Sequence, residues 1–476
     1  MTASKKLSIF DFTMIVVSLV IGMGIFRTPV NVAQAVGSQF VFFSVWIAGG
    51  LIALCGALTY AEIGSRLPVT GGYYKIFSYA YHPSIAFAVN CLILVSNAAS
   101  LAGVALVGGE YITGILIPES KTPGWFTIAA NAQHIQLIEI GIAISAIIIF
   151  YGVNLMGLKM SARAQNILTV IKITMIIMLV TPLFFASGGA HLPVAQHAGG
   201  TLFTEYLKAF GIGLVAVSFT YGGYQQTINF GAEVDQPKKN IPRGIFMGIF
   251  IIILLYLTIN YAYIRVIGFE ELKTSKNIAA IMASKIFGES AERVLSVLLF
   301  FSVLAYVNVL LMSNPRVMAA MSDDKILPSS FGRRNSRTDV LTTSLSVFAL
   351  LCVLIIFWAK EFDKVLKFSI FLDCFGMILS AGSIFIIRKK TRALNDSGIY
   401  IMRLYPLLPL IFIAAYTFVA VSLLVTETKI SLIGLAVLAG FIGLYFGVEA
   451  FGKKVIEPRS HSDTEGHGDD LPEDRN

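Results

Sequence analysis

The sequence predicts an all-α polytopic membrane protein with twelve transmembrane helices. Hydrophobic residues make up 56% of the 476-residue chain and charged residues only 13%, about half the share usual in a soluble domain. Long apolar segments recur along the chain, and each can cross a bilayer as a helix of about 20 residues. We therefore expect one helical bundle in the membrane, without separate soluble domains.

The first apolar window, residues 9–36, is too long for a secretory signal peptide and is expected to be the first span. Eleven further windows share its sustained hydrophobicity. They lie at about 40–64, 84–115, 135–153, 164–186, 203–230, 242–267, 291–320, 340–359, 364–387, 402–425 and 430–452.

Basic residues between these windows predict the orientation of the chain. They cluster in alternate connections and at both ends, as in Lys5 and Lys6, Lys238 and Lys239, and residues 388–392. The positive-inside rule makes that face cytoplasmic. Residues 1–8 are thus expected to be a cytoplasmic N-terminus, and the polar, acidic residues 453–476 a disordered cytoplasmic tail. Topology accounts for the net charge of +8, so no nucleic-acid partner is expected.

Two spans carry paired glycines at matching places. Gly22 and Gly24 lie within SLVIGMGIFRTP in the first span, and Gly222 and Gly223 within SFTYGGYQQ in the sixth. Interior glycines weaken a helix, and interruptions at the first and sixth spans are typical of transporters built from two inverted repeats of five spans. The alternative is that the glycines allow intact helices to pack closely.

A helix break of this kind exposes backbone groups that could bind a zwitterion. Freed N–H groups and the positive helix end favour a carboxylate, and freed carbonyls favour an ammonium. The candidate carboxylate donors are the N–H groups of Met23, Gly24 and Ile25, which follow Gly22 in the first break. The candidate ammonium acceptors are the carbonyls of Val20, Ile21, Phe219 and Gly222.

Four stretches resemble the amino acid–polyamine–organocation permeases in order and spacing. They are IGMGIF (21–26), LTYAEIGSRLPVTGGYY (58–74), FTYGGYQQTINFGAEVDQPKKNIPRGI (219–245) and NPRVMAAMSDDKILP (314–328). The chain looks most like bacterial relatives of the L-amino-acid transporters. This resemblance implies a LeuT-type fold, with a ten-helix inverted-repeat core at residues 9–388 and two additional spans at 389–452. It also implies amino-acid transport through the two breaks.

Some positions depart from the family pattern. Met23 stands where a small or hydroxylated residue is usual, so the backbone must bind the carboxylate without that side chain. Tyr224 stands where a tryptophan is common in the family. Ala232 stands where the first of two adjacent acidic residues is usual, so only the second of them, Glu233, is present here. We expect Phe219 and Tyr224 to form a wall or lid of the pocket.

Lys172 lies deep within the fifth apolar window, about 12 Å from its cytoplasmic end at about 1.5 Å per residue. An ionisable group at this depth is a functional candidate by default, and the alternative is that it snorkels to the interface. The resemblance implies that its ammonium takes the place of a sodium ion and braces the first, fifth and eighth spans. Transport is then expected to need no sodium, and release of the lysine proton could couple transport to protons.

Other charges are candidates for gates. Arg27 and Asp373 lie at similar depths on the first and tenth spans and are expected to pair as an outer gate, or else to be solvated separately. Glu62, Glu233 and Arg316 lie near cytoplasmic span ends. There they are expected to close the inner side as an ion-pair network, although solvated interface charges are an alternative.

The function classes can be narrowed on the same grounds. An enzyme would need convergent acid, base or metal groups, and we expect none, nor a cofactor or a metal site. The leading candidate function is amino-acid transport across the plasma (inner) membrane, either by exchange or by proton-linked uptake. Polyamine or other organic-cation transport is the alternative, for which Asp373 and Glu110 are the acidic candidates. The sequence leaves open whether a partner subunit is required.

Overall fold

The computed structural model describes residues 6–22, 24–116, 132–184, 203–275, 278, 281–282, 289–358, 362–394 and 398–456. Its regular elements within these residues are helices, and two isolated β-bridges lie outside them. The α-helices are α1 (Ile9–Val20), α2 (Gly24–Val36), α3 (Gln39–Arg66), α4 (Gly72–Ala80), α5 (Pro83–Leu116), α6 (Ala132–Leu155), α7 (Leu158–Val180), α8 (Phe203–Tyr221), α9 (Pro237–Val266), α10 (Phe269–Thr274), α12 (Glu289–Asp323), α13 (Thr342–Trp358), α14 (Phe362–Lys390), α15 (Leu407–Thr426) and α16 (Thr428–Ile456). The short 3₁₀ helices are η1 (Thr181–Phe184), η2 (Tyr224–Asn229), η3 (Gly231–Glu233), η4 (Ser329–Phe331) and η5 (Arg392–Leu394).

Most of these helices have the length and apolarity of membrane spans. Ten segments of the described chain qualify, counting α1 and α2 together as one segment of 28 residues. The predicted sixth and ninth spans correspond to α8, of 19 residues, and α13, of 17. This is a multi-pass membrane protein, as its composition predicts.

Both predicted helix breaks are present. α1 ends at Val20 and α2 begins at Gly24, while α8 ends at Tyr221 and the chain continues through η2 and η3. Gly223 has a φ of +108°, and a Cβ atom there would lie 2.2 Å from the Leu19 carbonyl oxygen. Only glycine fits this backbone conformation and this contact. Gly223 therefore allows the second break to pack directly against the first.

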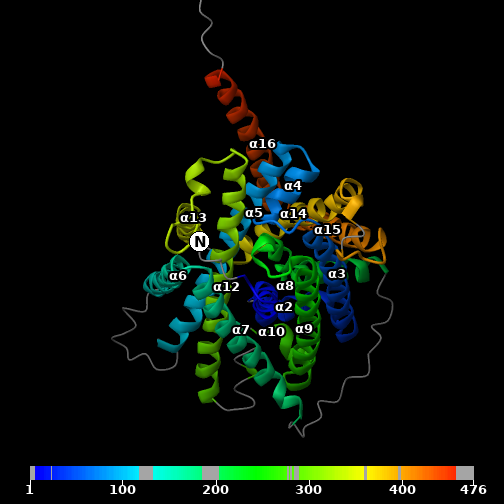
Figure 1. The fold of residues 1–476 in the computed structure, drawn as a ribbon. Coiled ribbons are helices and arrows are strands. Elements are labelled where there is room, and N and C mark those ends of the chain that lie inside the picture. The colour runs from blue at the N-terminus through cyan, green and yellow to red at the C-terminus, as the bar shows by residue number, and fades with distance from the viewer. Residues whose placement is uncertain are drawn as a thin grey trace, which may run out of the picture.

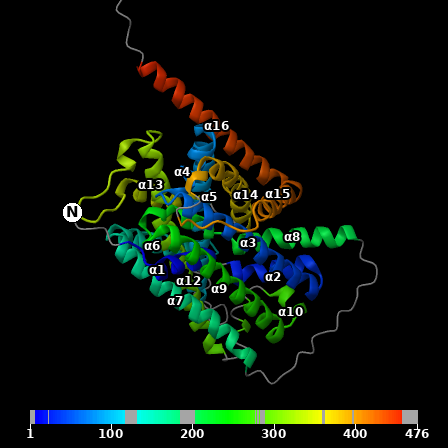
Figure 2. The same ribbon diagram turned by 45° about the vertical axis from the view of Figure 1, so that its right-hand side comes forward.

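The broken helices lie at the centre of the bundle. α2 packs against α8, and α1 packs against α7, α9 and η2. α5, which contacts both α12 and α14, closes the other side of this centre. Figures 1 and 2 show these helices as one bundle, with α16 extending beyond it at the C-terminal end.

One end of the bundle, which we call the N-side, carries Leu7, η3 and the start of α4. Here the segment before α1 forms a parallel β-bridge with Val234: Leu7 N donates to Glu233 O at 2.7 Å, and Asp235 N donates to Leu7 O at 2.9 Å. A second bridge joins Thr70 to Phe230. The N-terminal segment and the connection before α4 therefore both lie across the chain that follows the second break.

Candidate functional site

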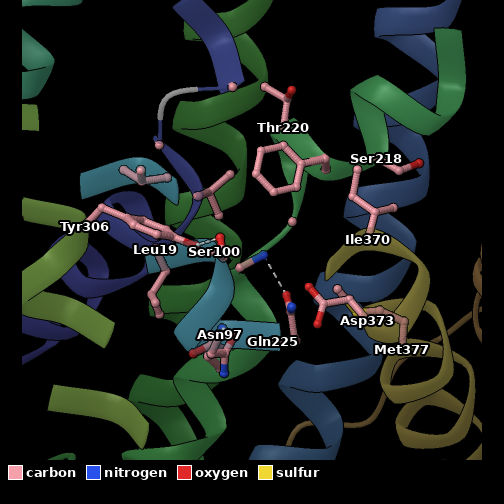
Figure 3. Close-up of a pocket in the computed structure, with 18 of the residues that line it drawn as sticks. Leu19, Asn97, Ser100, Ser218, Thr220, Gln225, Tyr306, Ile370, Asp373 and Met377 are labelled. Carbon is pink, nitrogen blue, oxygen red and sulfur yellow. Dashed lines mark hydrogen bonds between the residues drawn. The ribbon is translucent and has the colours of Figure 1, made fainter. Parts of the chain in front are cut away.

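A cavity lies between the two helix breaks, as Figure 3 shows. Its volume is about 50 Å³, which suits a small solute better than a drug-sized ligand. The lining residues contributed by the two broken spans, which we call the break wall, are Leu19, Val20, Gly22, Gly24, Ser218, Phe219, Thr220, Gly222, Gly223, Gln225 and Gln226. Those contributed by α5, α12, α14 and α15, which we call the side-chain wall, are Asn97, Ser100, Val104, Tyr306, Ile370, Asp373, Met377 and Tyr416.

The break wall presents backbone groups to the cavity. Gly24 and Ile25 open α2, so their N–H groups lack partners within the helix and lie at its positive end. The expected acceptors differ in how far they are engaged. Val20 O accepts from Gly22 N at 2.8 Å and from the Tyr256 hydroxyl at 3.0 Å, which uses both of its lone pairs, whereas Phe219 O accepts from Gly222 N at 3.0 Å. Because a carbonyl has two lone pairs, Phe219 O can still accept from the ammonium of a zwitterion.

Lys172 of α7 is fully buried and contacts the first break from behind. Its Nζ donates to the Ile21 carbonyl oxygen and lies 3.5 Å from the carbonyl and hydroxyl oxygens of Ser18. Snorkelling is thus excluded in this structure, because the ammonium points into the bundle. The contact is the one predicted between Lys172 and the first-span break.

A polar chain next to Lys172 connects α12 to α1. Asn308 Nδ2 donates to Gln165 Oε1 at 2.7 Å, and Gln165 Nε2 donates to the Ser18 hydroxyl. Because Ser18 also faces Lys172, the first, fifth and eighth spans meet at this point through side chains that are all buried.

The predicted substrate-binding residues divide into two groups. Val20, Gly22, Gly24, Phe219 and Gly222 line the cavity. The side chains of Ile21 and Ile25 are buried outside it, and Met23 lies outside the described residues.

Tyr224 does not form the predicted wall or lid. The 3₁₀ helix η2 turns its side chain away from the cavity into the contact with α3, where its ring packs 5.9 Å from that of Tyr60. It is fully buried there.

The structure also gives Arg27 a different partner from the one predicted. Its guanidinium pairs with Glu110 of α5, and both side chains are partly exposed. Asp373 faces the cavity, where its Oδ1 accepts from the Ser96 hydroxyl at 2.8 Å. Similar depth along two helices did not suffice to predict the pair, because the rotation of each helix decides where its side chain points.

The three predicted inner-gate residues lie in two separate clusters on the N-side. Arg316 of α12 forms a bidentate pair with Glu233, with Nε 3.0 Å from Oε1 and Nη2 2.8 Å from Oε2, and its guanidinium stacks 4.6 Å from the Phe230 ring centre. This pair joins α12 to the chain after the second break.

Glu62 forms the other cluster. Its carboxylate is fully buried and accepts from Arg66 Nε at 2.7 Å, from Arg388 Nε at 2.7 Å and from the backbone N–H of Met402 at 2.9 Å. It therefore joins α3 to α14 and to the connection that leads into α15.

Several polar residues of the site were not predicted from the sequence. Gln226 donates to Asn97 at 2.8 Å, and Asn97 donates to Asn314 at 2.7 Å. Ser100 and Tyr306 share a hydrogen bond of 2.8 Å across the side-chain wall. A polar side chain within an apolar span was the available signal for all of them. Within the described residues, no group of three or more His, Cys, Asp or Glu side chains could hold a metal ion.

Paired helix breaks that enclose a small cavity within membrane-length helices define a membrane transporter site. The chain belongs to the amino acid permease family, whose model matches residues 7–442. It is 26% identical over 450 residues to the serine/threonine exchanger SteT of Bacillus subtilis (strain 168), covering 94% of this chain and 97% of the relative. It is 26% identical over 456 residues to the human large neutral amino acids transporter small subunit 2, covering 93% and 80%. Over 289 residues it is 28% identical to the human cystine/glutamate transporter, covering 60% and 54%.

Proposed function

We propose that this protein carries amino acids across the inner membrane by alternating access, with twelve spans in a LeuT-type arrangement and both termini in the cytoplasm. The N-side is then the cytoplasmic side. The observation that carries the proposal is the cavity between the two breaks, which offers backbone N–H groups and carbonyls to one small solute. The relatives named above, all amino acid transporters or exchangers by name, support the same substrate class.

Transport is proposed to be sodium-independent. Lys172 places a positive charge against the Ile21 carbonyl, where a cation would otherwise be needed to compensate the exposed end of α1. A fixed ammonium leaves two ways to drive transport, which are exchange against an internal amino acid and symport with a proton. The exchanger named among the relatives favours the first.

Polyamine transport is less well supported. A polyamine has no carboxylate and carries several positive charges, so its site needs several acidic side chains. Among the described residues that line the cavity, Asp373 is the one carboxylate, and Glu110 pairs with Arg27 away from the lining.

The test is uptake into proteoliposomes that contain the purified full-length protein. A panel of labelled amino acids and polyamines is offered with and without internal amino acid, with and without a pH gradient, and in sodium or choline buffer. We expect uptake of at least one amino acid at the same rate in both buffers. Dependence on internal substrate identifies an exchanger, and dependence on the pH gradient a symporter. Failure of every amino acid to enter contradicts the proposal.

A further inference from the structure

Among the described residues that line the cavity, Asp373 is the one carboxylic acid. Figure 3 shows its carboxylate on α14 pointing into the cavity toward Gln225. The other described residues of the side-chain wall are neutral polar or apolar, and no lysine or arginine lines either wall.

The protein provides little compensation for this carboxylate. Ser96 donates to Oδ1 at 2.8 Å, and among the described residues Asp373 forms no ion pair. The cations on the first and fifth spans are engaged with other groups, since Lys172 donates to the Ile21 carbonyl oxygen and Arg27 pairs with Glu110. A carboxylate without a counter-charge in a narrow cavity is unfavourable, and a cation bound in the cavity would remove that cost.

The position of Asp373 determines which part of a substrate it can meet. On the proposed function, the break wall binds the carboxylate and ammonium common to all amino acids. Val104, Ile370 and Met377 offer apolar contact to a short carbon chain. Asp373 lies on α14 with Ile370 and Met377, so a substrate side chain that lies along these residues ends at its carboxylate.

We propose that Asp373 binds a positively charged side-chain group of the substrate, so that the site prefers short diamino acids such as ornithine or 2,4-diaminobutyrate. This inference rests on the proposed function and adds the substrate class. The second ammonium forms a charge-assisted hydrogen bond with the carboxylate oxygen that Ser96 leaves free.

The experiment compares ornithine with norvaline, which has the same carbon chain without the side-chain amine. Uptake of both into proteoliposomes is measured for the wild type, for Asp373→Asn, and for Glu270→Gln as a control that removes an exposed carboxylate far from the cavity. We expect the wild type and the control to prefer ornithine at least tenfold. Asp373→Asn should lose at least tenfold in ornithine uptake while norvaline uptake is kept or increased, which also shows that the variant is folded.

Three results would overturn the inference. The wild type could carry norvaline and exclude ornithine, or Asp373→Asn could keep the preference for ornithine. A third contradicting result is a wild type that carries neutral amino acids with a proton and an Asp373→Asn variant that loses only the proton coupling, because the carboxylate is then a proton carrier. If neither ornithine, norvaline nor any other amino acid enters, the proposed function itself fails.

Discussion

Lys172 places an ammonium at the end of a broken helix. Its ammonium is buried, forms no ion pair with a carboxylate among the described residues, and contacts oxygens of Ser18 and Ile21 at the point where α1 ends. The last carbonyls of a helix carry partial negative charge, so the cation and the broken helix stabilise each other. Removing the charge leaves the end of α1 uncompensated inside the bundle.

Lys172→Ala is therefore expected to abolish transport while the protein still inserts into the membrane. The measurement is uptake into proteoliposomes, together with size-exclusion chromatography of the purified variant. Arg163→Ala is the matched control, because it removes an exposed cation from the same helix, and it should transport as the wild type does. Full uptake by Lys172→Ala would exclude the role proposed for the lysine.

The depth of Lys172 predicted a functional lysine or one that snorkels, and the resemblance to the permeases implied its contact with the first break. The partners of Arg27 and Asp373 were not predicted, because Arg27 was expected to pair with Asp373 and pairs with Glu110 instead. Depth follows from residue number at about 1.5 Å per residue, whereas the direction of a side chain depends on helix rotation and packing, which the sequence alone does not supply.

At the scale of elements, Tyr256 of α9 joins the two breaks. Its hydroxyl lies 3.0 Å from Val20 O and 3.2 Å from Thr220 O. The single hydroxyl hydrogen is thus shared between a carbonyl at the end of α1 and one at the end of α8. The two half-helices are thereby held in register around the cavity. A change in their spacing during transport must break at least one of these contacts.

Tyr256→Phe removes this link and keeps the ring. We expect slower transport and a loss of stability of about 0.5–1.5 kcal/mol, the usual net contribution of one hydrogen bond. Tyr263→Phe on the same helix is the control, because the Tyr263 hydroxyl is buried and has no hydrogen-bond partner among the described residues. Equal effects of the two substitutions on transport would contradict the role of Tyr256.

The glycines of the first break differ in what surrounds them. A Cβ on Gly24 would lie 2.8 Å from the Thr220 hydroxyl oxygen and 3.1 Å from Thr220 Cα, whereas a Cβ on Gly22 would lie no closer than 3.8 Å to Tyr306. Gly24 is thus required for the close approach of α2 to α8.

Gly24→Ala is expected to impair substrate binding strongly and to cost about 1–3 kcal/mol through overpacking. Gly22→Ala is expected to retain most transport. Substrate affinity, measured by competition in proteoliposomes, and thermal stability of both variants check this contrast. A Gly22→Ala variant as impaired as Gly24→Ala would show that steric space does not explain the break.

For the whole molecule, Glu62 connects the predicted ten-helix core to the two last spans. Its carboxylate compensates Arg66 and Arg388 and also accepts from the backbone of Met402, ahead of α15. The sequence predicted an ion-pair network of Glu62 with Glu233 and Arg316 or solvated charges at the interface. It could not indicate Arg388 as the partner, because that residue is brought to Glu62 only by the packing of α14 on α3.

Glu62→Gln should destabilise the protein by about 3–5 kcal/mol, since it leaves two guanidinium groups without their counter-charge in a buried site. Thermal unfolding in detergent is the measurement. Glu110→Gln, which breaks the partly exposed pair with Arg27, is the matched comparison and should cost at most about 1 kcal/mol. Similar melting temperatures for the two variants would contradict a structural role for the Glu62 cluster.

The β-bridge between Leu7 and Val234 also constrains how the protein is made. Leu7 is synthesised before α1, but its partner is synthesised only after α8 and the break that follows it. The segment before α1 must therefore remain unattached while the helices from α1 to α8 are inserted. Closure of the N-side by this segment is thus a late step of biogenesis, completed only when the two broken helices have met.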